Sequence, residues 1–121
     1  MKLTNQQIFT YANALSQAFD SEQKLPIKIN FYLQKNKNLL MELVQDIEKA
    51  RLDIAETNGK LDEEKGQYAI DPDKIEIVQR ELTDLFNLEQ EVEIYTIDIN
   101  SLSDDLTLTT GQMEALMFMI N

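Results

Sequence analysis

Apolar residues recur at helical spacing near the start of the chain. Five of them fall on one face of an amphipathic helix: Ile8, Tyr11, Ala12, Leu15 and Phe19. Just before them, Thr4 and Gln7 have the spacing of a capping box, in which each side chain accepts a hydrogen bond from the other residue's backbone amide. The polar residues 20–23 then break the pattern and indicate a loop. We therefore predict a first helix that begins after Thr4 and ends near Phe19.

The segment from residue 25 to residue 36 fits two patterns. Its apolar and polar residues alternate from Leu25 to Leu33, which is typical of a strand. Pro26 is equally well placed in the first turn of a helix, and helical spacing of apolar residues continues from there to Ile54. We favour one long helix from about Pro26 to Thr57. Asn58-Gly59 is expected to end it in a left-handed conformation.

A charged loop, a strand and a third helix are predicted next. Residues 60–66 form the loop, and residues 67–70 are a short strand candidate. Asp71 and Pro72 then provide an N-cap and a first-turn proline. The helix that follows carries an apolar stripe over residues 75–86.

Residues 91–99 are rich in types that favour strands. Their alternation changes phase near Tyr95-Thr96, which indicates a bulge or burial on both faces. The simplest sheet pairs this segment with residues 67–70 across the third helix. The predicted fold is therefore α+β, a helix-dominated single domain spanning residues 1–121, with a long central helix and a small two-stranded sheet.

The C-terminal run is apolar on more than one side, which is typical of a helix that is deeply buried or shared with a partner. It follows a second capping box at residues 109–112. Its helical stripe consists of Met113, Leu116, Met117 and Ile120. We expect Leu116 and Ile120 in the chain's own core, and Phe118 and Met119, which fall off the stripe, in exposed contact. The candidate partner-binding residues are therefore Phe118, Met119, Met113 and Met117.

The composition excludes most familiar catalytic chemistries. The 121 residues include no His and no Cys, so imidazole or thiolate metal sites, disulfides, and His- or Cys-dependent nucleophiles are absent. The three scattered glycines form no phosphate-binding loop. Asp62-Glu63-Glu64 could gather a hard cation, but acids in a surface loop are usually solvated. We expect no catalytic residues, no metal site and no cofactor.

Charge is unevenly distributed along the chain, whose formal net charge is −11. Residues 1–41 hold five lysines against two acids, whereas residues 81–121 hold nine acids and no Lys or Arg. One interpretation is that the basic segment folds against the acidic one and both are partly neutralised. The other is an acidic surface that imitates nucleic acid or binds a basic partner.

One segment is both basic and aromatic. Its candidate anion-binding residues are Lys24, Lys28, Lys35 and Lys37. They are interleaved with Phe31 and Tyr32, and on a helix the first three lie at spacings of four and seven, so they could meet phosphates or an acidic partner. The alternative is a solvated face that balances the acidic C-terminal segment.

Several short stretches also resemble a known family. They are Lys2 to Ile8, Lys24 to Lys28 with Lys35-Asn36, Glu42-Leu43, Gly66 to Tyr68, Glu91 to Ile94, and Leu108 to Ile120. In these the chain resembles a family of small, uncharacterised proteins of phages and prophages of Gram-positive bacteria. The family carries no assigned catalytic residues, so the resemblance transfers none.

The resemblance and the acidity together imply a non-enzymatic, phage-encoded binding protein. Such a protein would inhibit or sequester a host defence factor or signal. A virion or tail assembly accessory protein is the alternative, and a metal-dependent enzyme that uses carboxylates alone is a second one.

The chain lacks recognisable targeting signals. Its first residues turn polar where a secretory signal needs an apolar run, and its longest apolar stretch, residues 115–120, is far short of the ~20 residues that span a bilayer. We expect a protein of the host cytoplasm with no membrane partner. Its expected partner is a host protein or a second copy, and nucleic acid enters only through mimicry.

Overall fold

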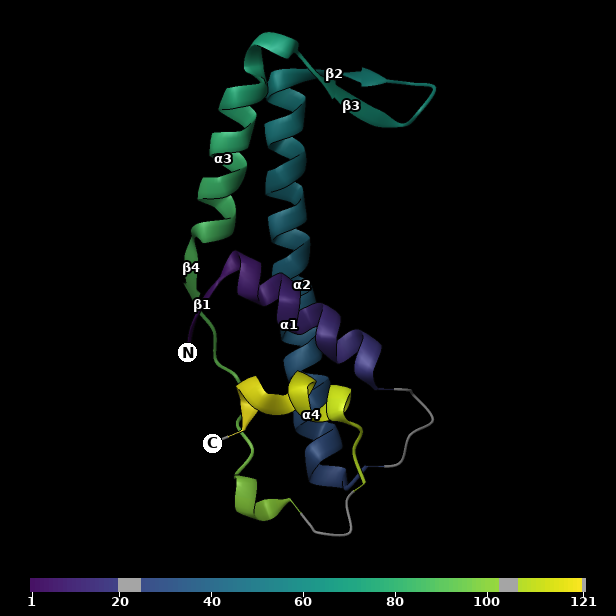
Figure 1. Cartoon of the computed structure of the whole chain (residues 1–121), viewed down its shortest axis with the longest axis vertical. Coiled ribbons are helices and arrows are strands. Elements are labelled where there is room, and N and C mark those ends of the chain that lie inside the picture. The colour runs from purple at the N-terminus through teal and green to yellow at the C-terminus, as the bar shows by residue number, and fades with distance from the viewer. Residues whose placement is uncertain (20–24, 103–106, 121) are drawn as a thin grey trace.

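The computed structural model describes residues 1–19, 25–102 and 107–120. Its four α-helices are α1 (Asn5–Ala18), α2 (Ile27–Asn58), α3 (Ile75–Asn87) and α4 (Thr110–Leu116). Helix α2 is the spine of an elongated molecule (Figure 1). Helix α1 packs on its N-terminal half with α4 against α1, and α3 runs beside its C-terminal half. This arrangement confirms the predicted helix-dominated α+β fold and its long central helix.

Both predicted capping boxes are present. At the start of α1 the Gln7 amide donates to Thr4 Oγ1 over 3.1 Å, and the Thr4 amide donates to Gln7 Oε1 over 2.9 Å. Thr109 and Gln112 repeat this exchange at the start of α4. The Gln112 amide nitrogen also donates to the carbonyl of Ala18, which ties α4 to the end of α1. Each box satisfies amides that a helix start leaves unpaired. The loop predicted at residues 20–23 lies outside the described residues.

The helical interpretation of residues 25–36 is confirmed, because α2 begins at Ile27 directly after Pro26. Its buried residues Ile29 and Leu33 are one helical turn apart, whereas Ile27 is 88% exposed and Phe31 is 53% exposed. A strand would have turned all four to the same face. The alternation is therefore a coincidence of composition, and the longer helical periodicity decides the structure.

The predicted left-handed end of α2 is wrong. Gly59 is extended, with φ −155°, and begins strand β2 (Gly59–Asp62), which pairs antiparallel with β3 (Gln67–Ile70). A Cβ at Gly59 would lie 2.4 Å from the carbonyl oxygen of Ala69, so close strand pairing is what requires glycine here. The left-handed residue is Gly66, with φ 65°, in the turn of the hairpin.

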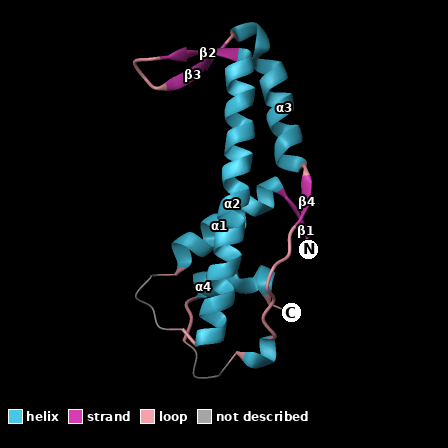
Figure 2. Cartoon of the chain, turned by 180° about the vertical axis from the view of Figure 1, so that it is seen from behind, coloured by secondary structure: helices cyan, strands magenta, loops and turns pink. Residues whose placement is uncertain are grey.

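The predicted strand pairing is also wrong, although residues 67–70 do form a strand and each sheet is small and two-stranded as expected. Strand β3 pairs with β2, and a second two-stranded sheet joins β1 (Lys2–Thr4) to β4 (Glu89–Glu91) (Figure 2). The reason is that α3 runs back along α2 and delivers β4 to the start of the chain, while the β2–β3 hairpin stays at the distal tip of α2. Residues 92–98 then continue mostly without strand pairing, apart from one bridge between Ile97 and Ile120.

The third helix starts with a short 3-10 turn, η1 (Pro72–Lys74), which has Pro72 in the expected first-turn position. Asp71 occupies the N-cap position, but its side chain makes no capping hydrogen bond there. It lies 3.9 Å from Lys74 Nζ instead. Asp71 is therefore at the predicted N-cap position, but the capping hydrogen bond predicted for its side chain is not formed.

The core lies where α1, α4 and the 92–97 segment meet the N-terminal half of α2. Its buried members are Leu3, Ile8, Ala12, Leu15, Ile29, Leu33, Leu40, Ile47, Val92, Ile97, Ala115, Leu116 and Met119. The distal half of the molecule, with α3 and the hairpin, contributes little to this cluster. We call the part of the molecule that holds α1, α4 and the first half of α2 the proximal half. Its buried core makes it the more rigid part of the fold.

Candidate functional site

An aromatic surface covers the first half of α2. The rings of Phe31 and Tyr32 are 6.1 Å apart, and Tyr32 stacks on Tyr95 at 5.5 Å. Lys28 Nζ lies 5.8 Å from the centroid of the Tyr32 ring, and Lys35 Nζ lies 5.5 Å from that of Phe31. We call this surface the aromatic face and define it as Ile27, Lys28, Phe31, Tyr32, Lys35 and Tyr95. It brings together residues that are more than 60 positions apart in the sequence.

Tyr95 is fixed in this face by its backbone. The buried side chain of Asn36 accepts from the Tyr95 amide over 2.8 Å and donates to the Tyr95 carbonyl over 2.9 Å. The same amide nitrogen of Asn36 lies 3.5 Å from the sulfur of Met119. The Asn36 side chain thus makes the two backbone hydrogen bonds that a neighbouring strand would make. These bonds fix the position of the extended segment against α2.

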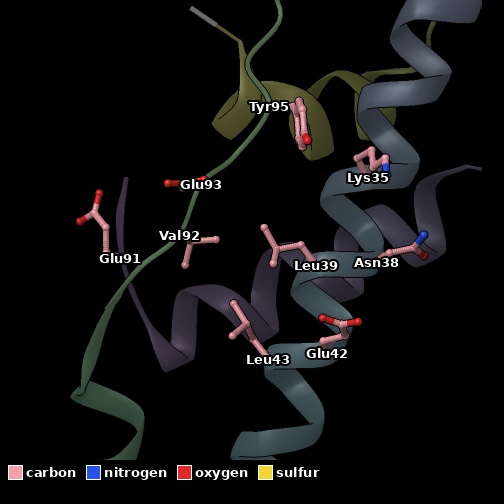
Figure 3. Close-up of a pocket in the computed structure, with 9 residues that line it drawn as sticks. All are labelled: Lys35, Asn38, Leu39, Glu42, Leu43, Glu91, Val92, Glu93 and Tyr95. Carbon is pink, nitrogen blue, oxygen red and sulfur yellow. The ribbon is translucent and has the colours of Figure 1, made fainter.

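A groove of about 490 Å³ adjoins the aromatic face, between α2 and the segment from Glu91 to Tyr95 (Figure 3). Its lining comprises Lys35, Asn38, Leu39, Glu42, Leu43, Glu91, Val92, Glu93 and Tyr95. In Figure 3 the side chains of Leu39 and Val92 extend toward one another from the two walls. Leu39 and Leu43 are half-buried and Val92 is buried, so these three form an apolar floor.

Carboxylates dominate the charge of this groove. Glu91 accepts a hydrogen bond of 2.9 Å from the N-terminal ammonium of Met1. This bond, together with the positive charge of the ammonium, lowers the pKa of Glu91. Glu42 and Glu93 form no ion pair with any described residue. Lys35 also lines the groove, but its ammonium lies against the Phe31 ring. Two glutamates of the groove are therefore available to a ligand.

The predicted lysine cluster is only partly assembled. Lys24 lies outside the described residues, and Lys28 and Lys35 lie on the aromatic face. Lys37 follows Lys35 by two residues, which is a rotation of about 200° around the helix, so it does not share that face. Within the described parts of the chain no ion pair joins these lysines to an acid. Among the described residues, Lys28, Lys35 and Lys37 therefore form no direct ion pair with the acidic segment.

The C-terminal partner-binding prediction needs correction. The α-helix stops at Leu116 and a 3-10 turn, η3 (Met117–Met119), follows, so the predicted stripe does not continue. Met119 is completely buried, and Phe118 is half-buried and stacks on Tyr11 at 4.3 Å. The tighter winding of η3 turns Met119 inward and leaves Met117 66% exposed. Of the four candidates, Met113 and Met117 are accessible.

Sequence reasoning missed Tyr95, Asn36 and Val92 as parts of a site. The available signal was the phase change near Tyr95-Thr96. The alternation changes phase at Tyr95, whose backbone is hydrogen-bonded to the Asn36 side chain and not to a neighbouring strand.

Other features offer less chemistry. No group of three or more acids in the described residues is arranged to hold a metal ion, and Asp62 accepts from the amides of Glu64 and Lys65 to shape the hairpin turn. No helix of the described chain is long and apolar enough to cross a membrane.

Comparisons with family models, with curated proteins and with solved structures found no match to this chain.

Proposed function

We propose that the protein is a non-enzymatic binding protein that docks onto another protein through the aromatic face and the adjoining groove. The observation that carries this proposal is the exposed apolar surface at Ile27 and Phe31, which continues through ring contacts to Tyr95. Soluble domains rarely expose connected apolar surface that has no partner. Aromatic side chains on a rigid base are also the residues that contribute most to protein interfaces.

The chemistry of the groove supports binding over catalysis. A general acid or base that works near neutral pH needs a pKa near 7. The N-terminal ammonium moves the pKa of Glu91 in the opposite direction, further below neutrality. The carboxylate-only enzyme considered from the sequence therefore gains no support from Glu91.

The shape of the groove favours a protein segment over a small signal molecule. Sites for small ligands enclose 70–90% or more of the ligand surface, whereas this groove continues into the exposed rings of Phe31 and Tyr95. The resemblance to phage and prophage proteins favours a host protein as the partner and inhibition of a host defence factor as the outcome. That setting, like the cytoplasmic location, is part of the proposal.

Site-specific photo-crosslinking tests this function. A photoreactive phenylalanine analogue at Phe31 should capture one protein in cells of a Gram-positive host. The same analogue at Leu88, which is exposed between the end of α3 and the start of β4, should not. Capture of the same protein with equal yield at both positions would contradict docking through the aromatic face. Stoichiometric presence of the protein in mature phage particles would favour the virion alternative.

A further inference from the structure

We infer that the groove beside the aromatic face accepts a basic segment of the partner, in which an apolar residue is flanked by Lys or Arg. This inference rests on the proposed function and adds the chemistry of the bound segment. It follows from the combination of an apolar floor with two glutamates, Glu42 and Glu93, that form no ion pair within the part of the chain that the structure describes.

The floor requires an apolar side chain. Leu39 and Leu43 from α2 meet Val92 from the opposite wall, and neither leucine is fully covered by the chain itself. Burial of the remaining apolar surface favours association, and a rigid floor loses little entropy when it binds. The Asn36 bonds to Tyr95 supply that rigidity three residues from Val92.

The rim requires positive charge. Glu42 lies beside the two leucines on α2, and Glu93 lies on the extended wall next to Val92. In Figure 3 the Glu93 carboxylate turns outward, where a long Lys or Arg side chain that passes over the rim can reach it. The ammonium of Lys35 lies against Phe31, so it does not pair with either carboxylate.

The charge of the whole chain favours the same occupant. With a net charge of −11, the protein attracts basic segments and repels acidic ones as they approach. A second copy of this chain carries the same net charge of −11, so long-range repulsion between the two copies disfavours self-association through the groove. A basic partner segment satisfies the floor, the rim and the long-range field together.

The test uses the full chain with methyl-labelled Leu and Val and a capped peptide, Lys-Leu-Lys-Leu-Lys, observed by NMR at low salt. The peptide should shift the methyl signals of Leu39, Leu43 and Val92. The double change Glu42→Gln with Glu93→Gln should weaken its binding about fivefold, because two exposed charge pairs are lost. A matched control, Glu63→Gln with Glu64→Gln in the distal hairpin turn, removes the same charge and should leave the affinity within about twofold.

Three results would overturn the inference. They are equal shifts of these methyl groups with Glu-Leu-Glu-Leu-Glu, equal loss of affinity in the hairpin control, and concentration-dependent shifts with dimerisation in sedimentation, which would assign the groove to a second copy. Failure of the peptide with successful crosslinking at Phe31 would overturn the basic segment alone. Failure of crosslinking would overturn the docking function itself, whatever the peptide does.

Discussion

Asn36 on α2 pairs through its side-chain amide with both backbone groups of Tyr95, at 2.8 and 2.9 Å. Asn36 is completely buried and lies 59 residues from its partner in sequence. A single side-chain amide therefore satisfies both backbone groups that a neighbouring strand would otherwise pair with. It joins the core of the proximal half to the wall of the candidate groove.

Replacing Asn36 should be costly for this reason. Asn36→Ala leaves the Tyr95 amide and carbonyl without their partner and opens space beside Met119, so we expect a loss of about 2–4 kcal/mol in the free energy of unfolding. Asn38→Ala, two residues along on the exposed side of α2, should change it by less than about 0.5 kcal/mol. Chemical denaturation of both variants measures the difference. Equal, small losses would show that the Asn36–Tyr95 pair does not stabilise the fold.

The C-terminal turn permits a second comparison between neighbouring methionines. Met119→Ala removes a completely buried side chain and should cost about 2–5 kcal/mol, whereas Met117→Ala changes an exposed one and should cost less than about 1 kcal/mol. Denaturant titrations of the two variants decide the matter. Similar costs, or a larger cost for Met117, would contradict the inward position of Met119 in η3.

Helices were predictable because their signals are local. The capping boxes need residues only three positions apart, and the buried stripe of α2 repeats within each turn, so Thr4, Gln7 and Leu33 could be placed without tertiary information. Strand pairing was not predictable. Lys2–Thr4 and Glu89–Glu91 are three residues each, and their pairing is decided by where α3 returns the chain.

The part of the candidate site that lies on α2 was predictable, because its signal is also local in sequence. Lys28, Phe31 and Lys35 share one helix, so their spacing alone places them on a common face. Tyr95 joins them only because Asn36 fixes a distant segment, and an asparagine within a helical stripe gives no sign of its partner. Met119 was misplaced because a 3-10 turn replaces the expected α-helix after Leu116.

A third prediction concerns high pH. Tyr68 on β3 donates a 2.8 Å hydrogen bond to Glu56 on α2, and this bond, with a smaller contribution from burial and the negative charge of Glu56, raises the pKa of Tyr68 above 10.0. A raised folded-state pKa means that the stabilisation is complete below the unfolded pKa and is lost as pH rises through the folded pKa. The hairpin should therefore loosen from α2 above about pH 10.

Tyr68→Phe is the control for this effect. It removes the phenol, so its stability should fall less between pH 9 and pH 11 than that of the wild type. Ultraviolet titration of the tyrosines, compared between the two proteins, gives the pKa directly. A Tyr68 pKa at or below the ordinary value would contradict the bond to Glu56.

The last prediction separates two glycines with opposite roles. At Gly59 an added Cβ would lie 2.4 Å from the Ala69 carbonyl oxygen, so Gly59→Ala must push β2 away from β3 and should cost about 1–3 kcal/mol. At Gly111, in the first turn of α4, the nearest atom is Thr109 Oγ1 at 4.0 Å, so Gly111→Ala meets open space and should gain up to about 1 kcal/mol from lower chain entropy. Denaturation of the two variants, with amide exchange across residues 59–70, measures both effects. We expect faster exchange in the hairpin for Gly59→Ala alone, and a stable hairpin in that variant would contradict the close approach of β2 and β3.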